Sequence, residues 1–192
     1  MLNAKYFQKL RAGMLAYAEQ RREVIKNAGD AEHLAKRAIF ALQRGNIAEA
    51  GKYLPQAEHL LQSLARKFRA TLKLLDEGSY RAAQEEYAEA RLFAQFLANA
   101  PFGPITGLTI APDIYLAGLC DVPGELARYA TRAATEGNVA EVERSYQAAE
   151  AAVGELLAMN LTGYHRQKLD QAKQALYRLQ QLVYETRQQA SG

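Results

Sequence analysis

The sequence lacks the features that mark several common protein classes. Its 192 residues include a single cysteine, Cys120, and no tryptophan. One cysteine cannot form an internal disulfide and is typical of a reducing compartment. No run approaches the ~18 apolar residues of a membrane-spanning helix, and the first residues contain no apolar core of signal-peptide length. We therefore expect a cytoplasmic protein without a membrane partner.

Common nucleotide-binding and hydrolase motifs are also missing. The patterns GxxxxGK[ST], GxGxxG and GxSxG do not occur, so P-loop, dinucleotide-binding and α/β-hydrolase functions have no support. His33 and His59 have no His or Cys four residues away on the same helix face. The sequence therefore offers no helical zinc site.

What the sequence does contain is helical periodicity along almost its whole length. Helices are expected at about 5–44, 47–75, 80–99, 112–135, 139–160 and 164–189, with Gly and Asn turns between most of them. Pro123 falls inside one of these helices, where we expect a kink and not a chain break. The prediction is an all-α, multihelical antiparallel bundle of about six to seven helices. It has a long first helix and forms one domain over residues 1–192.

Two carboxylate pairs have helical spacing. Glu86 and Glu89 are three residues apart, and Asp121 and Glu125 are four apart, so each pair lies on one helix face. At 100° per residue, the first pair shares its face with apolar residues such as Phe93. The opposite face is expected to meet water and carries Arg81, Gln84, Glu85, Ala88, Arg91 and Gln95. A carboxylate on an apolar face needs a cation, a proton or hydrogen-bond donors.

The two pairs are expected to meet across a hairpin. Glu89 lies about ten residues before the Pro- and Gly-rich loop 101–111, and Asp121 about nine residues after it. At ~1.5 Å per residue, both would lie at the same level of two antiparallel helices. Four converging carboxylates make a hard-oxygen site suited to Mg²⁺ or Mn²⁺. The alternative is that each pair contacts its own Arg or Lys within the chain.

Charge is distributed unevenly. Residues 1–75 carry 14 basic and 6 acidic side chains, whereas residues 76–125 carry 2 basic and 8 acidic ones. A basic stripe on the first helix falls within about 80° and consists of Arg11, Arg22, Lys26, His33, Arg37 and Arg44, with Lys36 beside it. Such a stripe favours binding to a phosphate backbone. A solvated surface is the alternative.

Three stretches resemble the translin superfamily. Residues 113–129, DIYLAGLCDVPGELARY, are similar to the family pattern D-Y-L-x-G-x-x-D-x-x-G-E-L-x-R. Residues 36–44, KRAIFALQR, and 86–90, EYAEA, are similar to two further family patterns. Within the superfamily, the chain is similar to translin-associated factor X and its prokaryotic relatives, because it has acids at positions 86, 89, 121 and 125.

The resemblance implies a function. Family members are all-α and assemble as closed, octamer-like shells with RNA inside. By this resemblance the chain is expected to be a homo-oligomeric, metal-dependent endoribonuclease acting on single-stranded RNA. The catalytic residues and ligands of Mg²⁺ or Mn²⁺ would be Glu86, Glu89, Asp121 and Glu125. The basic stripe would hold the RNA backbone, and Arg128 would orient the acids or a phosphate.

Two alternatives remain open at this stage. The chain would be a non-catalytic oligomer that binds RNA or single-stranded DNA if the acids are structural. It would be a helical protein-interaction scaffold if the weak repeat beginning at Gly45, Gly78 and Gly137 reflects repeated helix pairs. Metal-dependent cleavage, salt-sensitive binding without cleavage, and no nucleic-acid binding separate the three.

Overall fold

The computed structural model describes residues 2–190, which contain seven α-helices and no strand. They are α1 (Ala4–Gln43), α2 (Ile47–Lys67), α3 (Leu72–Leu75), α4 (Gly78–Leu97), α5 (Pro112–Thr135), α6 (Val139–Ala158) and α7 (Gly163–Ala190). The all-α prediction with a long first helix is confirmed. The expected boundaries agree to within about two residues, except at one place.

The exception is the expected helix 47–75, which is divided into α2 and the short α3. Residues 68–71 form a turn in which the Thr71 N–H donates to the Phe68 carbonyl at 2.8 Å. The turn allows both Phe68 and Leu74 to be buried. In one continuous helix these residues, six positions apart, would point to different faces, so they could not both pack against the same core. Pro55 in α2 and Pro123 in α5 interrupt neither helix.

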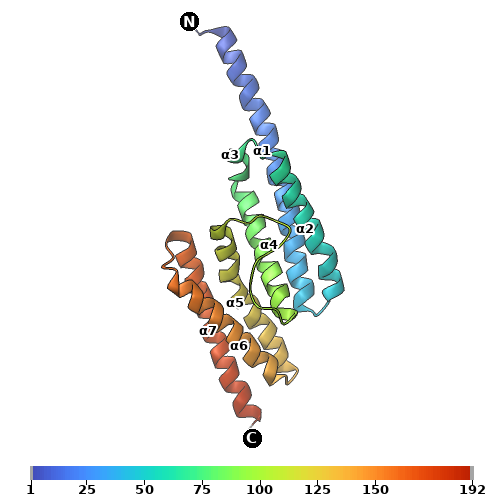
Figure 1. Ribbon diagram of the computed structural model, residues 1–192, viewed down its shortest axis with the longest axis vertical. Coiled ribbons are helices and arrows are strands. Elements are labelled where there is room, and N and C mark those ends of the chain that lie inside the picture. Colours follow the sequence, from blue (N-terminus) through green and yellow to red (C-terminus); the bar gives the residue numbers. More distant parts are fainter. Residues whose placement is uncertain (1, 191–192) are drawn as a thin grey trace.

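The helices form a layered array with α4 and α5 at its centre (Figure 1). Helices α1 and α2 pack on the α4 side, and α6 and α7 pack on the α5 side. Helices joined by short turns, such as α1 and α2, are antiparallel (Figure 1). Helix α4 is therefore covered on several sides, and Gln84 and Ala88 of its expected water face are buried. That part of the prediction was wrong, because the fold places α4 between α1 and α5.

Helices α4 and α5 run parallel, whereas the sequence analysis expected an antiparallel hairpin. Near their starts Arg81 pairs with Asp113, and near their ends the rings of Phe96 and Tyr129 are 5.8 Å apart. The segment 98–111 returns alongside α4: the Gly103 N–H donates to Gln95, and Gln84 donates to the Thr109 carbonyl. Fourteen extended residues can span more than the ~30 Å of a 20-residue helix, so a parallel connection is possible.

Two turns explain the weak sequence repeat. Gly45 and Gly137 have φ of +73° and +72°, in the left-handed region that favours glycine. The following residues, Asn46 and Asn138, each accept the backbone N–H of a glutamate three residues on and so cap α2 and α6. These repeated letters encode helix starts, and the structure contains no array of repeated helix pairs within residues 2–190.

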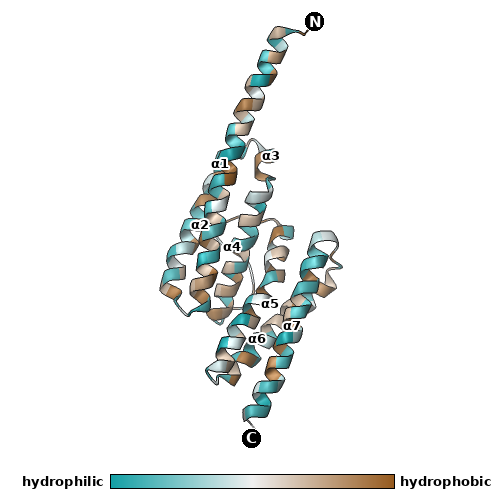
Figure 2. Ribbon diagram, turned by 180° about the vertical axis from the view of Figure 1, so that it is seen from behind, coloured by the Kyte–Doolittle hydropathy of each residue, from teal (hydrophilic) through white to brown (hydrophobic). Residues whose placement is uncertain are grey.

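The first part of α1 projects beyond the other helices (Figure 1). Every residue from 4 to 16, hereafter the N-terminal arm, is exposed, and the buried residues of α1 begin at Val24. The arm nevertheless carries apolar residues, which colour parts of its ribbon brown in Figure 2. Leu10 and Met14 are 45% and 65% exposed. No helix within residues 2–190 is long and apolar enough to cross a membrane.

Candidate functional site

The carboxylate pairs lie near a close approach of α4 to α5 at Gly118. A Cβ built on Gly118 would lie 2.8 Å from the Glu85 carbonyl oxygen and 3.0 Å from the Glu89 nitrogen, so only glycine fits. Because the two helices are parallel, Glu89 and Asp121 stand at the same level, and both line one cavity of about 570 Å³. The expected juxtaposition is present, although the hairpin used to predict it is not.

Glu89 is a buried carboxylate without a partner. Its residue is 7% exposed, and it makes no hydrogen bond or ion pair with any described part of the chain. Burial raises its pKa to about 8, and the nearby charges of Asp121 and Glu86 contribute in the same direction. A carboxylate in this position is stabilised by a proton or by a cation. Glu89 lines the cavity, where such a cation would have access to it.

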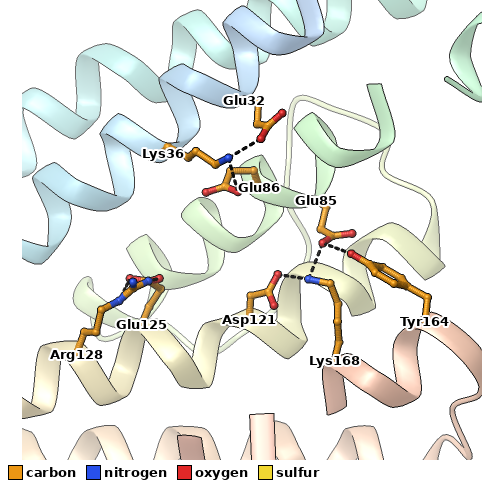
Figure 3. Close-up of polar contacts among 9 residues, drawn as sticks. All are labelled: Glu32, Lys36, Glu85, Glu86, Asp121, Glu125, Arg128, Tyr164 and Lys168. Atoms are coloured by element: carbon orange, nitrogen blue, oxygen red, sulfur yellow. Dashed lines mark hydrogen bonds and ion pairs between the residues drawn. The ribbon is translucent and has the colours of Figure 1, made fainter. Parts of the chain in front are cut away.

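Asp121 is held by a lysine from α7 (Figure 3). The Lys168 ammonium donates to Asp121 Oδ2 and forms a second ion pair with Glu85 Oε1 at 2.6 Å. The Tyr164 hydroxyl also donates to Glu85, at 2.9 Å. Burial would lower the pKa of Lys168, but the hydrogen bonds to Asp121 and Glu85 raise it above its ordinary value. Lys168 is therefore a charged ammonium within the acidic cluster.

Glu125 and Glu86 face basic groups on the other side of the cluster. Glu125 is 2% exposed, accepts a hydrogen bond from Gln43 at 2.8 Å, and is paired with Arg128. Glu86 lies 3.9 Å from the Lys36 ammonium (Figure 3). Burial raises the pKa of Glu86, and Lys36 opposes that shift. Glu86 and Glu125 line a second cavity of about 530 Å³, which shares Glu125 and Arg128 with the first.

The side chains of the four acids are not gathered into one set of metal ligands. Within residues 2–190, no group of three or more His, Cys, Asp or Glu side chains is arranged to hold a metal ion. The donors are nevertheless hard carboxylate oxygens, and the unpartnered Glu89 opens to a cavity shared with Asp121 and Glu125. The residues fit a divalent cation chemically, provided that the ion pairs around them rearrange.

Cys120 lies next to Asp121 but does not take part in the site. It is a free, buried cysteine. Burial and the charge of Asp121 raise the pKa of its thiol to about 11. The protonated thiol is a weak nucleophile and metal ligand, so Cys120 acts as a small packing residue.

The eight basic residues expected to bind nucleic acid are all exposed. Six of them lie on α1, and Arg44 directly follows the last residue of that helix. They are Arg11, Arg22, Lys26, His33, Lys36, Arg37, Arg44 and, on α5, Arg128. Lys26 pairs with Asp30, Lys36 with Glu32, and Arg37 donates to the Tyr53 hydroxyl. Within the described chain, the side chains of Arg11, Arg22 and His33 form no ion pair or hydrogen bond.

Sequence reasoning missed the residues that hold the acids in place. Glu85 was assigned to the water face, but it lies at the contact with α5 and α7. Lys168 was not considered, although a signal was available. At 100° per residue, Lys168 shares its face with Ala172, Ala175 and Leu179, which are all buried. A lysine on the apolar face of a helix needs an acidic partner elsewhere in the fold.

The Translin family model matches residues 19–187 of the chain. Among solved structures, apo-NeC3PO aligns with a TM-score of 0.86 and 20% identity, over 97% of this chain and 98% of that one. AfC3PO aligns with a TM-score of 0.84 and 22% identity, over 97% and 100%. AfC3PO in complex with duplex RNA aligns with a TM-score of 0.82 and 22% identity, over 95% and 96%. At these identities the likeness establishes the fold. No curated protein matches the chain significantly.

Proposed function

This chain belongs to the Translin family, and we propose that it is a homo-oligomeric endoribonuclease that depends on Mg²⁺ or Mn²⁺. The observation that carries this proposal is Glu89, a buried carboxylate with no hydrogen-bond or ion-pair partner in the described chain. It faces a cavity that is also lined by the acids Asp121, Glu125 and Glu185. Nothing in the packing of α4 explains such a group, whereas a cation would neutralise it.

The acids have separable roles in this proposal. Glu89 and Asp121 would provide the main ligands, because they stand at the same level on neighbouring helices. Glu86 and Glu125, which line the second cavity, would provide the remaining ligands. A divalent cation bound there would supply Lewis-acid chemistry for attack on a phosphodiester. Arg128, between the two cavities, would pair with a phosphate when it leaves Glu125.

RNA would lie along α1. The same helix that carries the basic stripe contacts the acidic site through Lys36, near Glu86, and through Gln43, bonded to Glu125. Phe40 lies on the stripe and is 64% exposed, with the Arg44 guanidinium 5.5 Å from its ring centroid. An exposed ring among basic groups is suited to stacking against an unpaired base while the cations contact phosphates.

The substrate is proposed to be single-stranded RNA, with single-stranded DNA as a further ligand. A base stacked on Phe40 must be unpaired, which favours single strands over duplex at this position. AfC3PO was solved with duplex RNA, so a short duplex belongs in the same assay as a comparison.

Self-assembly is supported by the N-terminal arm. Tyr6, Leu10, Met14 and Tyr17 recur at helical spacing and fall within about 80°. This stripe is largely exposed, and the arm projects from the bundle. Tyr17 packs against the core of its own chain, but Tyr6, Leu10 and Met14 are exposed on the projecting arm. An exposed apolar stripe of this kind suits an interface between copies. We propose a closed, octamer-like homo-oligomer.

A second candidate function is RNA or single-stranded DNA binding without catalysis. The observation that favours it is that three of the four acids are engaged with Lys168, Arg128 or Lys36. In that case the acids serve to join α1, α4, α5 and α7, and no divalent cation is required.

A cleavage assay distinguishes the two candidates. Labelled single-stranded RNA and a short RNA duplex are incubated with the protein in Mg²⁺, Mn²⁺ or EDTA, beside the Glu89→Ala/Asp121→Ala double variant. The nuclease proposal expects cleavage only with a divalent cation and none by the variant. RNA binding without cleavage in every condition would establish the binding function instead.

A further inference from the structure

Lys168 lies within the acidic cluster and pairs with two of its carboxylates. It is the one basic side chain in the described chain paired with Asp121, and also the one paired with Glu85. Its side chain is 12% exposed. It comes from α7, whereas the two carboxylates come from α5 and α4, so the ammonium joins three helices (Figure 3).

We propose that Lys168 is a built-in counter-cation that competes with a divalent ion for Asp121. This inference rests on the proposed metal-dependent function. In the metal-free protein, the ammonium neutralises Asp121, which would otherwise be a half-buried negative charge next to Glu89. When a divalent ion binds, Lys168 releases Asp121. Lys168 is thus a regulatory residue that sets the concentration of divalent ion needed to fill the site. It does not touch the reacting atoms.

Glu85 makes this release possible. A buried lysine that lost its only partner would be strongly destabilised. Lys168 has a second carboxylate at 2.6 Å, and Glu85 is itself held in place by the Tyr164 hydroxyl at 2.9 Å. The ammonium can therefore remain paired with Glu85 while Asp121 turns toward the cavity. The flexible four-carbon stem of lysine suits such a shift, which a planar guanidinium would not make as readily.

Two substitutions have opposite expected effects on metal affinity. Lys168→Met keeps most of the length of the side chain but removes the positive charge, so Mn²⁺ should bind about 10- to 100-fold more tightly. Glu85→Gln leaves Lys168 with Asp121 as its only carboxylate partner. It also makes the site more positive by one charge, so Mn²⁺ should bind about 10-fold more weakly.

The experiment is a calorimetric titration of the metal-free full-length protein with Mn²⁺ alone, together with thermal unfolding in EDTA and in Mn²⁺. Lys168→Met should lower the midpoint of unfolding in EDTA and should show a larger rise with Mn²⁺ than the wild type. Arg144→Met is the matched control, because Arg144 is also part-buried, pairs with Glu141 at 2.6 Å and joins α6 to α4. It should lower the midpoint without changing Mn²⁺ affinity.

The possible outcomes separate this inference from the proposed function. If the wild type binds Mn²⁺, Glu89→Ala abolishes binding, and Lys168→Met binds equally or more weakly, Lys168 is not a competitor and the inference fails alone. If neither the wild type nor Lys168→Met binds Mn²⁺, both the metal-dependent function and the inference fail. Should Lys168→Met not fold, Glu85→Gln still decides, because unchanged or tighter binding there contradicts the inference.

Discussion

The carboxylates of Glu89 on α4 and Asp121 on α5 line the same cavity, but only Asp121 has a cationic partner in the described chain. This asymmetry is what the proposed metal site expects and what an ordinary network of buried ion pairs does not. In a purely structural network, Glu89 would be the most costly member, because its charge is buried and unpaired. The Glu89 carboxylate is therefore the group whose behaviour best separates the candidate functions.

Glu89→Gln should stabilise the metal-free protein at high pH. The pKa of Glu89 is raised to about 8 by burial and by the neighbouring acids. A raised pKa contributes stability that is complete below the ordinary value near 4.5 and is lost as the pH rises through 8. Glutamine resembles the protonated acid, so the variant should be more stable by roughly 2–4 kcal/mol at pH 8.5 and nearly equal at pH 5.

Denaturant unfolding in EDTA at the two pH values measures this difference. Glu155→Gln is the control, because Glu155 is exposed and makes no ion pair in the described chain. A constant difference between Glu89→Gln and wild type across this pH range would mean that Glu89 is not titrating in the expected window.

Gly118→Ala should separate α4 from α5. The added methyl group would meet the Glu85 carbonyl oxygen at 2.8 Å and the Glu89 nitrogen at 3.0 Å, both backbone atoms that cannot rotate away. We expect a loss of about 1–3 kcal/mol in the free energy of unfolding, larger than the gain in helix propensity. The matched control is Gly124→Ala on the same helix, because a Cβ added at Gly124 would meet no atom within 4 Å. That variant should be neutral or more stable by up to about 1 kcal/mol. Equal effects of the two changes would contradict the close approach.

Arg22→Ala and Arg44→Ala should weaken RNA binding in a salt-dependent way. Both side chains are exposed on the basic stripe and form no ion pair with the described chain. Each substitution should reduce the slope of log affinity against log salt by about 1 if it removes one phosphate contact. Fluorescence anisotropy with labelled single-stranded RNA at several salt concentrations measures the slope. Lys52→Ala, exposed on α2 and outside the stripe, should leave it unchanged. A similar loss with Lys52→Ala would indicate that binding follows net charge and not the stripe.

Leu10→Asp together with Met14→Asp should prevent assembly without unfolding the bundle. Both residues lie on the N-terminal arm, which precedes the first buried residue of α1. Light scattering coupled to size exclusion should show a smaller particle, and the thermal unfolding of the bundle core should be little changed. Leu157→Asp, a 54% exposed position on α6, is the control and should preserve the assembly. An unchanged particle in the double variant would show that the arm is not the interface.

Much of the fold could be predicted because local patterns decide it. The helix boundaries follow from Gly45 and Gly137, which supply left-handed turns, and from Asn46 and Asn138, which cap the next helices. The break after Lys67 could not be predicted, because it depends on how Phe68 and Leu74 pack in three dimensions.

The site was only partly predictable for a related reason. The spacing of the acids identified Glu89 and Asp121, but the direction of α5 relative to α4 depends on how segment 98–111 is held by Gln84 and Gln95. Two neighbouring helices can bring the same residues together whether they run parallel or antiparallel. The predicted juxtaposition of Glu89 and Asp121 was therefore correct, although the predicted hairpin was wrong. Lys168, about fifty residues away in sequence, could only be identified once α7 was placed against α5.

Comparing wild type and Glu89→Gln for RNA binding and for Mn²⁺-dependent cleavage, on the same preparations, decides whether the chain is a metal-dependent endoribonuclease. Binding is measured by anisotropy in EDTA, and cleavage is followed with excess protein over a 5′-labelled single-stranded RNA. We expect equal RNA affinity for both proteins and a loss of at least about 100-fold in the cleavage rate of the variant, equivalent to about 2.7 kcal/mol in the barrier. Equal cleavage rates would show that Glu89 is not a ligand of a catalytic metal, and the endoribonuclease assignment would be wrong.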